Sequence, residues 1–159
     1  MAEFEEINVH IGEVKLGYRE AKLQAILGSC VGIILLDRER GMCTLSHSLL
    51  PFNSRPDPSR KGRWVNQAVM AAIGLLRLGP GEHGRLQAVV AGGGSMMGTH
   101  DVSKIEVGKS NTESALSVLD EMNIPIIQQD TGGHNGRNIS INSSSLEYQI
   151  EILPRALEK

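Results

Sequence analysis

Two residues of the kinds used in covalent catalysis, Cys30 and His47, lie near each other in the N-terminal third of the chain. Cys30 ends the short run Gly28-Ser29-Cys30 and directly precedes an apolar segment, so its thiol is expected at the mouth of a buried strand. A turn made of small residues leaves the sulfur open to approach, and it can aim backbone N–H groups at the group that the sulfur attacks. These features predict a cysteine nucleophile.

A cysteine needs a basic partner to act at neutral pH, because the pKa of a free thiol is about 8.5. His47 is the best candidate for this base. A polar turn, DRERG, separates two apolar segments, and the antiparallel hairpin that it predicts would place Cys30 roughly opposite residues 44–47. The spacing alone also fits a small buried cysteine and a hydrogen-bonded strand histidine without catalytic roles. Cys43 lies inside the second segment without a glycine turn and is expected to be inert.

The other elements expected from hydrophobic periodicity would form a scaffold around this pair. Alternating or continuous apolar runs predict strands at residues 6–16, 23–27, 31–36, 42–49, 86–91, 124–128, 138–142 and 146–153. One helix is predicted over residues 62–78 from apolar residues at helical spacing, and a second from Ser110, which with Glu113 fits a capping box. This order predicts a single domain over residues 1–159, an α/β layered sandwich with a mixed, largely antiparallel sheet and two main helices.

The composition argues against several other classes of protein. A formal net charge of −2 gives no electrostatic reason to expect nucleic acid or an anionic membrane as a partner. The N-terminal residues do not resemble a signal peptide and the apolar runs are too short to span a bilayer, so we expect a cytoplasmic protein with reduced cysteines. The histidines lack the spacing of a zinc site, and the glycines at 92–94 lack the surrounding motif of a phosphate-binding loop.

Several short motifs, in order along the chain, resemble one known family. The run LGSCVGIILLD at residues 27–37, followed by HSLLP from His47, is similar to the cysteine and histidine motifs of the chemoreceptor glutamine deamidases of bacterial chemotaxis, CheD. Further similarity lies in GGGSMM at 92–97, VGKSN at 107–111 and DTGGHNGR at 130–137, which resemble the family's GGA.M, IGERN and D.GG..GR segments. Each match is short, but as an ordered set they are specific.

The resemblance implies hydrolysis of selected glutamine side-chain amides on methyl-accepting chemotaxis receptors, which gives glutamate and ammonia. Within it, Cys30 is the nucleophile and His47 the general base of a protein-glutamine glutaminase, and no metal or organic cofactor is required. Members of the family also associate with a phosphatase that acts on the chemotaxis response regulator. The substrate cleft is expected to be lined by Ser29, Gly92, Gly93 and Gly94.

One position departs from the family's pattern. Six residues before the cysteine, where the family usually has a threonine that orients the histidine, this chain has Gln24. The side-chain carbonyl of Gln24 could accept a hydrogen bond from the imidazole and take over that orienting role. The alternative is that Gln24 marks a non-catalytic chemotaxis adaptor, which binds a response-regulator phosphatase or the receptors.

Overall fold

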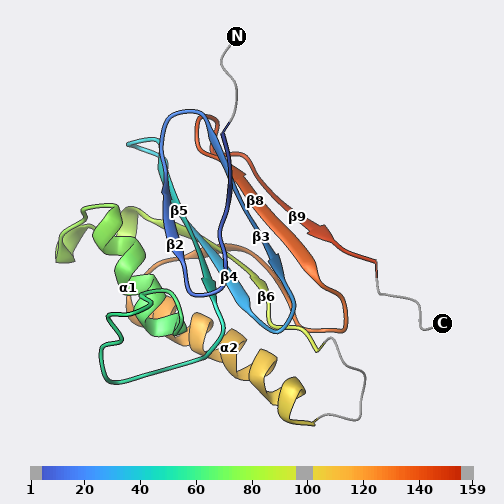
Figure 1. Ribbon diagram of the computed structural model, residues 1–159. Helices are drawn as coiled ribbons and strands as arrows, with labels where there is room; N and C mark the ends of the chain where they lie inside the picture. Colours follow the sequence, from blue (N-terminus) through green and yellow to red (C-terminus); the bar gives the residue numbers. More distant parts are fainter. Residues whose placement is uncertain (1–4, 96–101, 155–159) are drawn as a thin grey trace.

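The computed structural model describes residues 5–95 and 102–154, which form two β-sheets and a helical layer (Figure 1). One sheet has the strand order β1-β3-β8-β9 and the other the order β2-β5-β4-β6-β7. The strands are β1 (Glu5–Asn8), β2 (Val14–Gly17), β3 (Ala21–Leu27), β4 (Val31–Asp37), β5 (Met42–Ser48), β6 (Gln87–Gly92), β7 (Ile126–Thr131), β8 (Arg137–Asn142) and β9 (Tyr148–Ile152). The helices are α1 (Val65–Leu75), η1 (Pro80–Arg85), which is a short 3-10 helix, and α2 (Val102–Glu121).

β4 is the central strand of the five-stranded sheet and is buried on both faces. Its residues Ile34 and Leu36 pack in the layer between the two sheets, together with Leu23 of β3. Ile33 and Leu35 point the other way and pack with apolar residues of α1 and α2. Figure 1 shows both long helices on the face of the five-stranded sheet that is turned away from β8 and β9. The order of layers is therefore sheet, sheet, helices, and the predicted α/β layered class with two main helices is confirmed.

The first extended segment of the chain forms two strands, one in each sheet. Residues 6–16, predicted as a single strand, contribute to β1 and β2, which pair with β3 in one sheet and with β5 in the other. Between them the chain reverses: Gly12 has a φ of 87°, and the His10 N–H donates to Glu13 Oε1 at 2.8 Å. A turn closed by a side chain interrupts the loosely alternating run, so its two halves join different sheets.

α1 is shorter than the predicted 62–78, because the residues before it are bound to the segment that follows β5. The Arg63 carbonyl accepts hydrogen bonds from the N–H groups of Leu49 and Leu50, both at 3.1 Å. Trp64 forms an isolated β-bridge with Leu50. The extended backbone needed for these contacts delays the helix until Val65.

α2 begins at Val102 and not at Ser110, so the predicted capping box of Ser110 with Glu113 lies inside the helix. Gly108 is also inside the helix, where glycine lowers helix propensity. Its missing side chain lets α2 lie close to the glycine segment, residues 92–94 at the end of β6. A Cβ at position 108 would lie 2.6 Å from the Gly94 carbonyl oxygen. Across the described ranges, no helix is both long and apolar enough to cross a bilayer.

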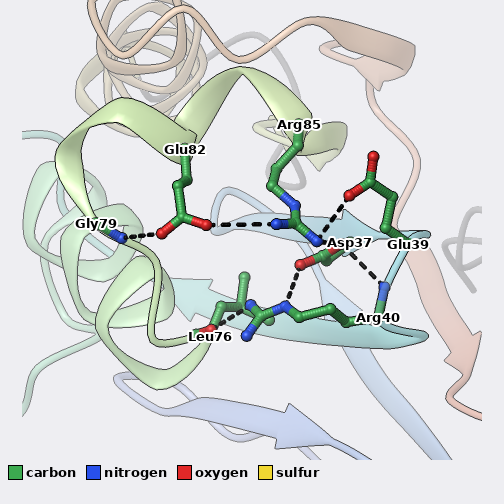
Figure 2. Close-up of polar contacts among 7 residues, drawn as sticks. All are labelled: Asp37, Glu39, Arg40, Leu76, Gly79, Glu82 and Arg85. Carbon is green, nitrogen blue, oxygen red and sulfur yellow. Dashed lines mark hydrogen bonds and ion pairs between the residues drawn. The ribbon is translucent and has the colours of Figure 1, made fainter.

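A buried carboxylate fixes the end of β4 that is farthest from Cys30 (Figure 2). Asp37 is fully buried and accepts hydrogen bonds from Arg40 Nε at 2.6 Å and from Arg85 Nη2 at 3.4 Å. Arg85 also contacts Glu39 at 2.9 Å and Glu82 at 3.4 Å. Desolvation, the largest single influence, opposes ionisation of Asp37, but the bonds from Arg40 and the charge of Arg85 together lower its pKa. The carboxylate is therefore charged at neutral pH.

Replacing Asp37 by asparagine is expected to lower the free energy of unfolding by about 2 kcal/mol, because it removes the buried, charged acceptor of the partly exposed Arg40 and Arg85 guanidinium groups. The measurement is urea unfolding followed by the fluorescence of Trp64, the one tryptophan. Because folding lowers the pKa of Asp37, its stabilisation is complete above the ordinary carboxyl pKa of about 4 and is lost as the pH falls through the lower, folded value. Arg38→Gln, at an exposed neighbouring position, is the control and should change stability by less than about 0.5 kcal/mol. Equal stabilities for Asp37→Asn and wild type would contradict the prediction.

Candidate active site

The hairpin of β4 and β5 brings Cys30 and His47 to the same face of the five-stranded sheet. Its register places Gly32 opposite His47 and Val31 opposite Ser48. Cys30 directly precedes β4, two residues from Gly32, and its side chain packs in the core layer between the two sheets. The predicted hairpin is confirmed, but its register differs from the expected one: continued past Val31, it sets Cys30 against Leu49 and not against residues 44–47. The thiol and the imidazole belong to diagonally neighbouring positions across the hairpin.

The glycine segment at the end of β6 is hydrogen-bonded to the turn that carries Cys30. The Gly93 N–H donates to the Cys30 carbonyl at 2.9 Å, and the Gly94 N–H donates to the Gly28 carbonyl at 3.0 Å. Gly92 has a φ of 104°, and a Cβ there would lie 2.2 Å from the Cys30 carbonyl oxygen. Any side chain at position 92 would therefore displace the cysteine turn.

The glycines at positions 92 and 93 make room for neighbouring segments of the protein itself. The space left at Gly92 is filled by the Cys30 backbone, and the space at Gly93 is filled by Thr112 of α2. The missing side chains thus make room for the protein's own segments, while contact of Ser29 and Gly92 to Gly94 with a substrate stays a prediction. Met96 and Met97, which complete the predicted glycine-rich motif, lie outside the described residues.

The Cys30 thiol is in an environment that favours its neutral form. Its side chain belongs to a residue that is only 6% exposed. Burial raises the pKa of Cys30, and the residue's own backbone N–H, which lies against the sulfur, lowers the pKa by a smaller amount. The resting group is therefore a thiol at neutral pH, and it requires a base to become a nucleophile.

The His47 imidazole has the tautomer and the free nitrogen that such a base needs. Its Nδ1 lies 2.9 Å from the Val9 carbonyl oxygen, which can only accept, so the proton is on Nδ1 and the lone pair on Nε2. Nε2 is buried and has no hydrogen-bond partner among the described residues. Burial lowers the pKa of His47, although the bond to Val9 raises it in part. His47 is therefore neutral and able to accept a proton at pH 7.

The segment between β1 and β2 holds His47 in place through three hydrogen bonds. Besides the bond from Nδ1 to Val9, the Gly12 N–H donates to the His47 carbonyl at 2.7 Å, and the His47 N–H donates to the Glu13 carbonyl at 3.0 Å. Val9 itself is held by the Gln24 carbonyl, which accepts from its N–H at 2.8 Å. Sequence reasoning missed Val9, because a backbone carbonyl leaves no signal in the residue type.

The side chain of Gln24, one of the two roles considered for this position, does not contact the imidazole in this structure. Its amide nitrogen donates to Asn8 Oδ1 at 3.0 Å, and the Val9 carbonyl occupies the orienting position on Nδ1. Gln24 is connected to the ring only indirectly. The parallel pairing of β1 with β3 lets its main-chain carbonyl accept a hydrogen bond from the N–H of Val9, whose own carbonyl contacts the imidazole. The orienting group of His47 is therefore a main-chain carbonyl.

A hollow of about 750 Å³ reaches His47 from the surface. Val9 and Gln24 line it, and its rim carries two exposed apolar side chains, Ile11 at 43% and Ile26 at 69% exposure. A hollow of about 810 Å³ lies nearby against α1, but it contains neither Cys30 nor His47. The hollow at His47 does not include Cys30, and Nε2 itself is buried. The thiol, expected from the sequence to be open to approach, is therefore buried in this structure.

Comparison with known proteins identifies the family. A family model described as CheD chemotactic sensory transduction matches residues 49–152. The chain is 33% identical over 151 positions to a probable chemoreceptor glutamine deamidase CheD of Bdellovibrio bacteriovorus, covering 94% of this chain and 96% of that protein. It is 34% identical over 170 aligned positions to a second such protein, CheD 2 of a Ruegeria species, with coverage of 96% and 95%. A CheD of Moorella thermoacetica is 32% identical, with coverage of 97% and 95%. The matched segment and the nearly full-length relatives agree, and this chain belongs to the CheD family.

Proposed function

We propose that this chain hydrolyses glutamine side-chain amides on chemoreceptors, with Cys30 as the nucleophile and His47 as the general base. The observation that supports the chemistry most directly is the Nε2 atom of His47. This nitrogen is basic, unpaired among the described residues, and on the same face of the hairpin as the thiol. Membership in the CheD family and the names of the aligned relatives support the substrate.

In the first half-reaction, His47 Nε2 takes the proton of the Cys30 thiol while the sulfur attacks the side-chain carbonyl carbon of glutamine. The developing oxyanion accepts a hydrogen bond from the Cys30 N–H, which lies beside the sulfur. Collapse of the tetrahedral intermediate breaks the C–N bond. His47 gives its proton to the leaving nitrogen, ammonia departs, and a thioester to Cys30 is left.

In the second half-reaction, His47 Nε2 removes a proton from water, and the oxygen attacks the thioester carbonyl. The C–S bond breaks and the sulfur recovers its proton from His47, which leaves glutamate on the receptor. One water is consumed and one ammonia is released for each glutamine. Because both groups start neutral, His47 acts as a base during attack and not as a permanent counter-ion of a thiolate.

The experiment that tests the proposal incubates the protein with the cytoplasmic part of a chemoreceptor and maps its peptides by mass spectrometry. We expect the change in mass from amide to acid at selected glutamines, with an equal amount of ammonia released. Receptor incubated without the protein corrects for spontaneous deamidation. If no receptor peptide changes above that background, the proposed activity is wrong.

The proposal gives Gln24 a main-chain role, and its side chain is expected to be nearly dispensable. Gln24→Ala keeps the carbonyl that holds Val9, so kcat should change by less than about threefold. Gln24→Thr restores the residue usual at this position in the family and should give the same result. The measurement is the initial rate of ammonia release at saturating receptor. A loss of about tenfold or more in the alanine variant, restored in the threonine variant, would instead assign the orienting role to the side chain.

Association with a chemotaxis phosphatase and a cytoplasmic location are further parts of the proposal, and both rest on the family. The adaptor function is the second candidate, favoured only by the departure at Gln24. A pull-down with the phosphatase separates the two functions. Binding by Cys30→Ala as well as by wild type, together with no deamidation by wild type, would favour the adaptor.

A further inference from the structure

A buried side chain of α2 joins the two segments that carry Cys30 and His47. Asn111 is fully buried, and its Nδ2 donates to the Ser29 carbonyl at 3.0 Å and to the Leu49 carbonyl at 2.9 Å. Both acceptors are carbonyl oxygens, so the orientation of the amide is fixed with its NH₂ toward them. Ser29 directly precedes the cysteine, and Leu49 lies two residues after the histidine.

The bond to Ser29 also sets the direction of the Cys30 N–H. The Ser29 carbonyl and the Cys30 N–H belong to one planar trans peptide, in which the C=O and N–H bonds point in opposite directions. When Asn111 fixes the oxygen toward α2, the N–H is fixed away from α2. This is the backbone N–H of the nucleophilic residue itself, which lies beside any carbonyl group that becomes bonded to the sulfur.

The other end of the Asn111 amide is unusual for a residue kept only for stability. Its Oδ1 is buried and has no hydrogen-bond partner among the described residues. A buried acceptor without a partner costs free energy, whereas an apolar side chain of similar size would not carry that cost. Asparagine at this position therefore makes two hydrogen bonds to the segments of the site at a cost in the free energy of unfolding.

We propose that Asn111 is a positioning residue, which aligns the Cys30 N–H and the cysteine turn with His47 for attack on the amide. This inference rests on the proposed function and deepens it. Asn111 touches neither the substrate nor the reacting atoms in this role. It acts through the two carbonyls that it holds, and its loss should slow the chemical step without weakening binding of the receptor.

The test compares Asn111→Leu with Ser114→Ala. Ser114 lies on the same helix, and its hydroxyl donates a hydrogen bond to the Pro51 carbonyl. It is a matched control, because this bond also joins α2 to a loop but does not involve the cysteine turn. We expect Asn111→Leu to lower kcat on the order of 10²-fold, the effect of a misaligned or lost oxyanion donor. The KM for receptor should stay within about threefold, and Ser114→Ala should keep kcat within about threefold. Each kcat is divided by the folded fraction measured from Trp64 fluorescence.

A second variant, Asn111→Asp, gives a readout that a purely structural role would not move. A protonated carboxyl can still donate one hydrogen bond to the two carbonyls, whereas a carboxylate can donate none. The ratio of its kcat to that of wild type should therefore rise as the pH is lowered from mildly alkaline to mildly acidic. Taking the ratio removes the titration of His47 that both proteins share.

Three results would overturn the inference. They are a kcat of folded Asn111→Leu within about threefold of wild type, a loss that lies entirely in KM, and a ratio for Asn111→Asp near one at every pH. If the leucine variant does not fold, the aspartate ratio decides. Failure of the proposed function looks different, because then the wild type itself shows no deamidation or Cys30→Ala stays active.

Discussion

Cys30→Ser is expected to lower the rate of receptor deamidation by on the order of 10⁴-fold or more, because it removes the atom that forms the thioester. Serine keeps the size and the backbone of the turn but is a far weaker nucleophile in a neutral, buried setting. The measurement is ammonia release and peptide mass, with each rate corrected for the folded fraction. A variant that keeps a tenth or more of the wild-type rate would exclude Cys30 as the nucleophile.

Cys43→Ala is the matched control for this prediction. Cys43 is fully buried in β5, and burial raises the pKa of its thiol to about 12, so it has no thiolate at neutral pH. Its removal is expected to cost stability but to leave the rate per folded molecule within about threefold of wild type. An acyl-enzyme mass on the peptide that contains Cys30, trapped by rapid acid quench, would identify the intermediate directly.

The part of the site that lies in one hairpin could be predicted from the sequence. Apolar segments on either side of a short polar turn predict the pairing of β4 with β5, whereas the exact register, which sets Cys30 and His47 on one face, is known only from the structure. The burial of β4 on both faces was equally visible as a continuous apolar run. In such cases the pattern and the structure depend on the same local periodicity.

The groups that arrange this pair come from distant segments and could not be predicted in the same way. Val9 orients His47 with a main-chain oxygen, and this role depends on the parallel pairing of β1 with β3. Asn111 reaches the cysteine turn only because α2 starts at Val102 and Gly108 lets it lie against the glycine segment. Gly108 and Asn111 have low helix propensity, and their value lies in close packing and in buried hydrogen bonds that propensity does not include.

The same division applies to position 24, where the sequence directs attention to the side chain and the structure shows a contact made by the main chain. A glutamine in place of threonine draws attention to its side chain, yet the structure uses the carbonyl that every residue carries. A function supplied by the main chain tolerates substitution of the side chain as long as the strand pairing is kept. The departure from the family's usual residue is therefore compatible with activity.

His47→Gln is expected to lower kcat/KM on the order of 10³-fold and to remove the acid limb of the pH profile. Glutamine can still donate a hydrogen bond to the Val9 carbonyl, so the fold around the site is kept, but it has no basic nitrogen. In the wild type, activity requires neutral His47, whose fraction grows as the pH rises through its pKa. Burial lowers that pKa, so the acid limb should lie below the ordinary histidine value of about 6.5.

Alkylation of Cys30 by iodoacetamide tests the same neutral pair independently of substrate. Burial raises the thiol pKa, so the alkylation rate should be low at neutral pH and should climb with pH above the ordinary thiol value of about 8.5. His83→Gln, in η1 and away from the hollow at His47, is the control and should keep both the acid limb and the alkylation profile of the wild type. A fast alkylation rate that is already constant at neutral pH would show a resting thiolate paired with a charged His47. The base mechanism, in which His47 takes the proton only as the sulfur attacks, would then be wrong.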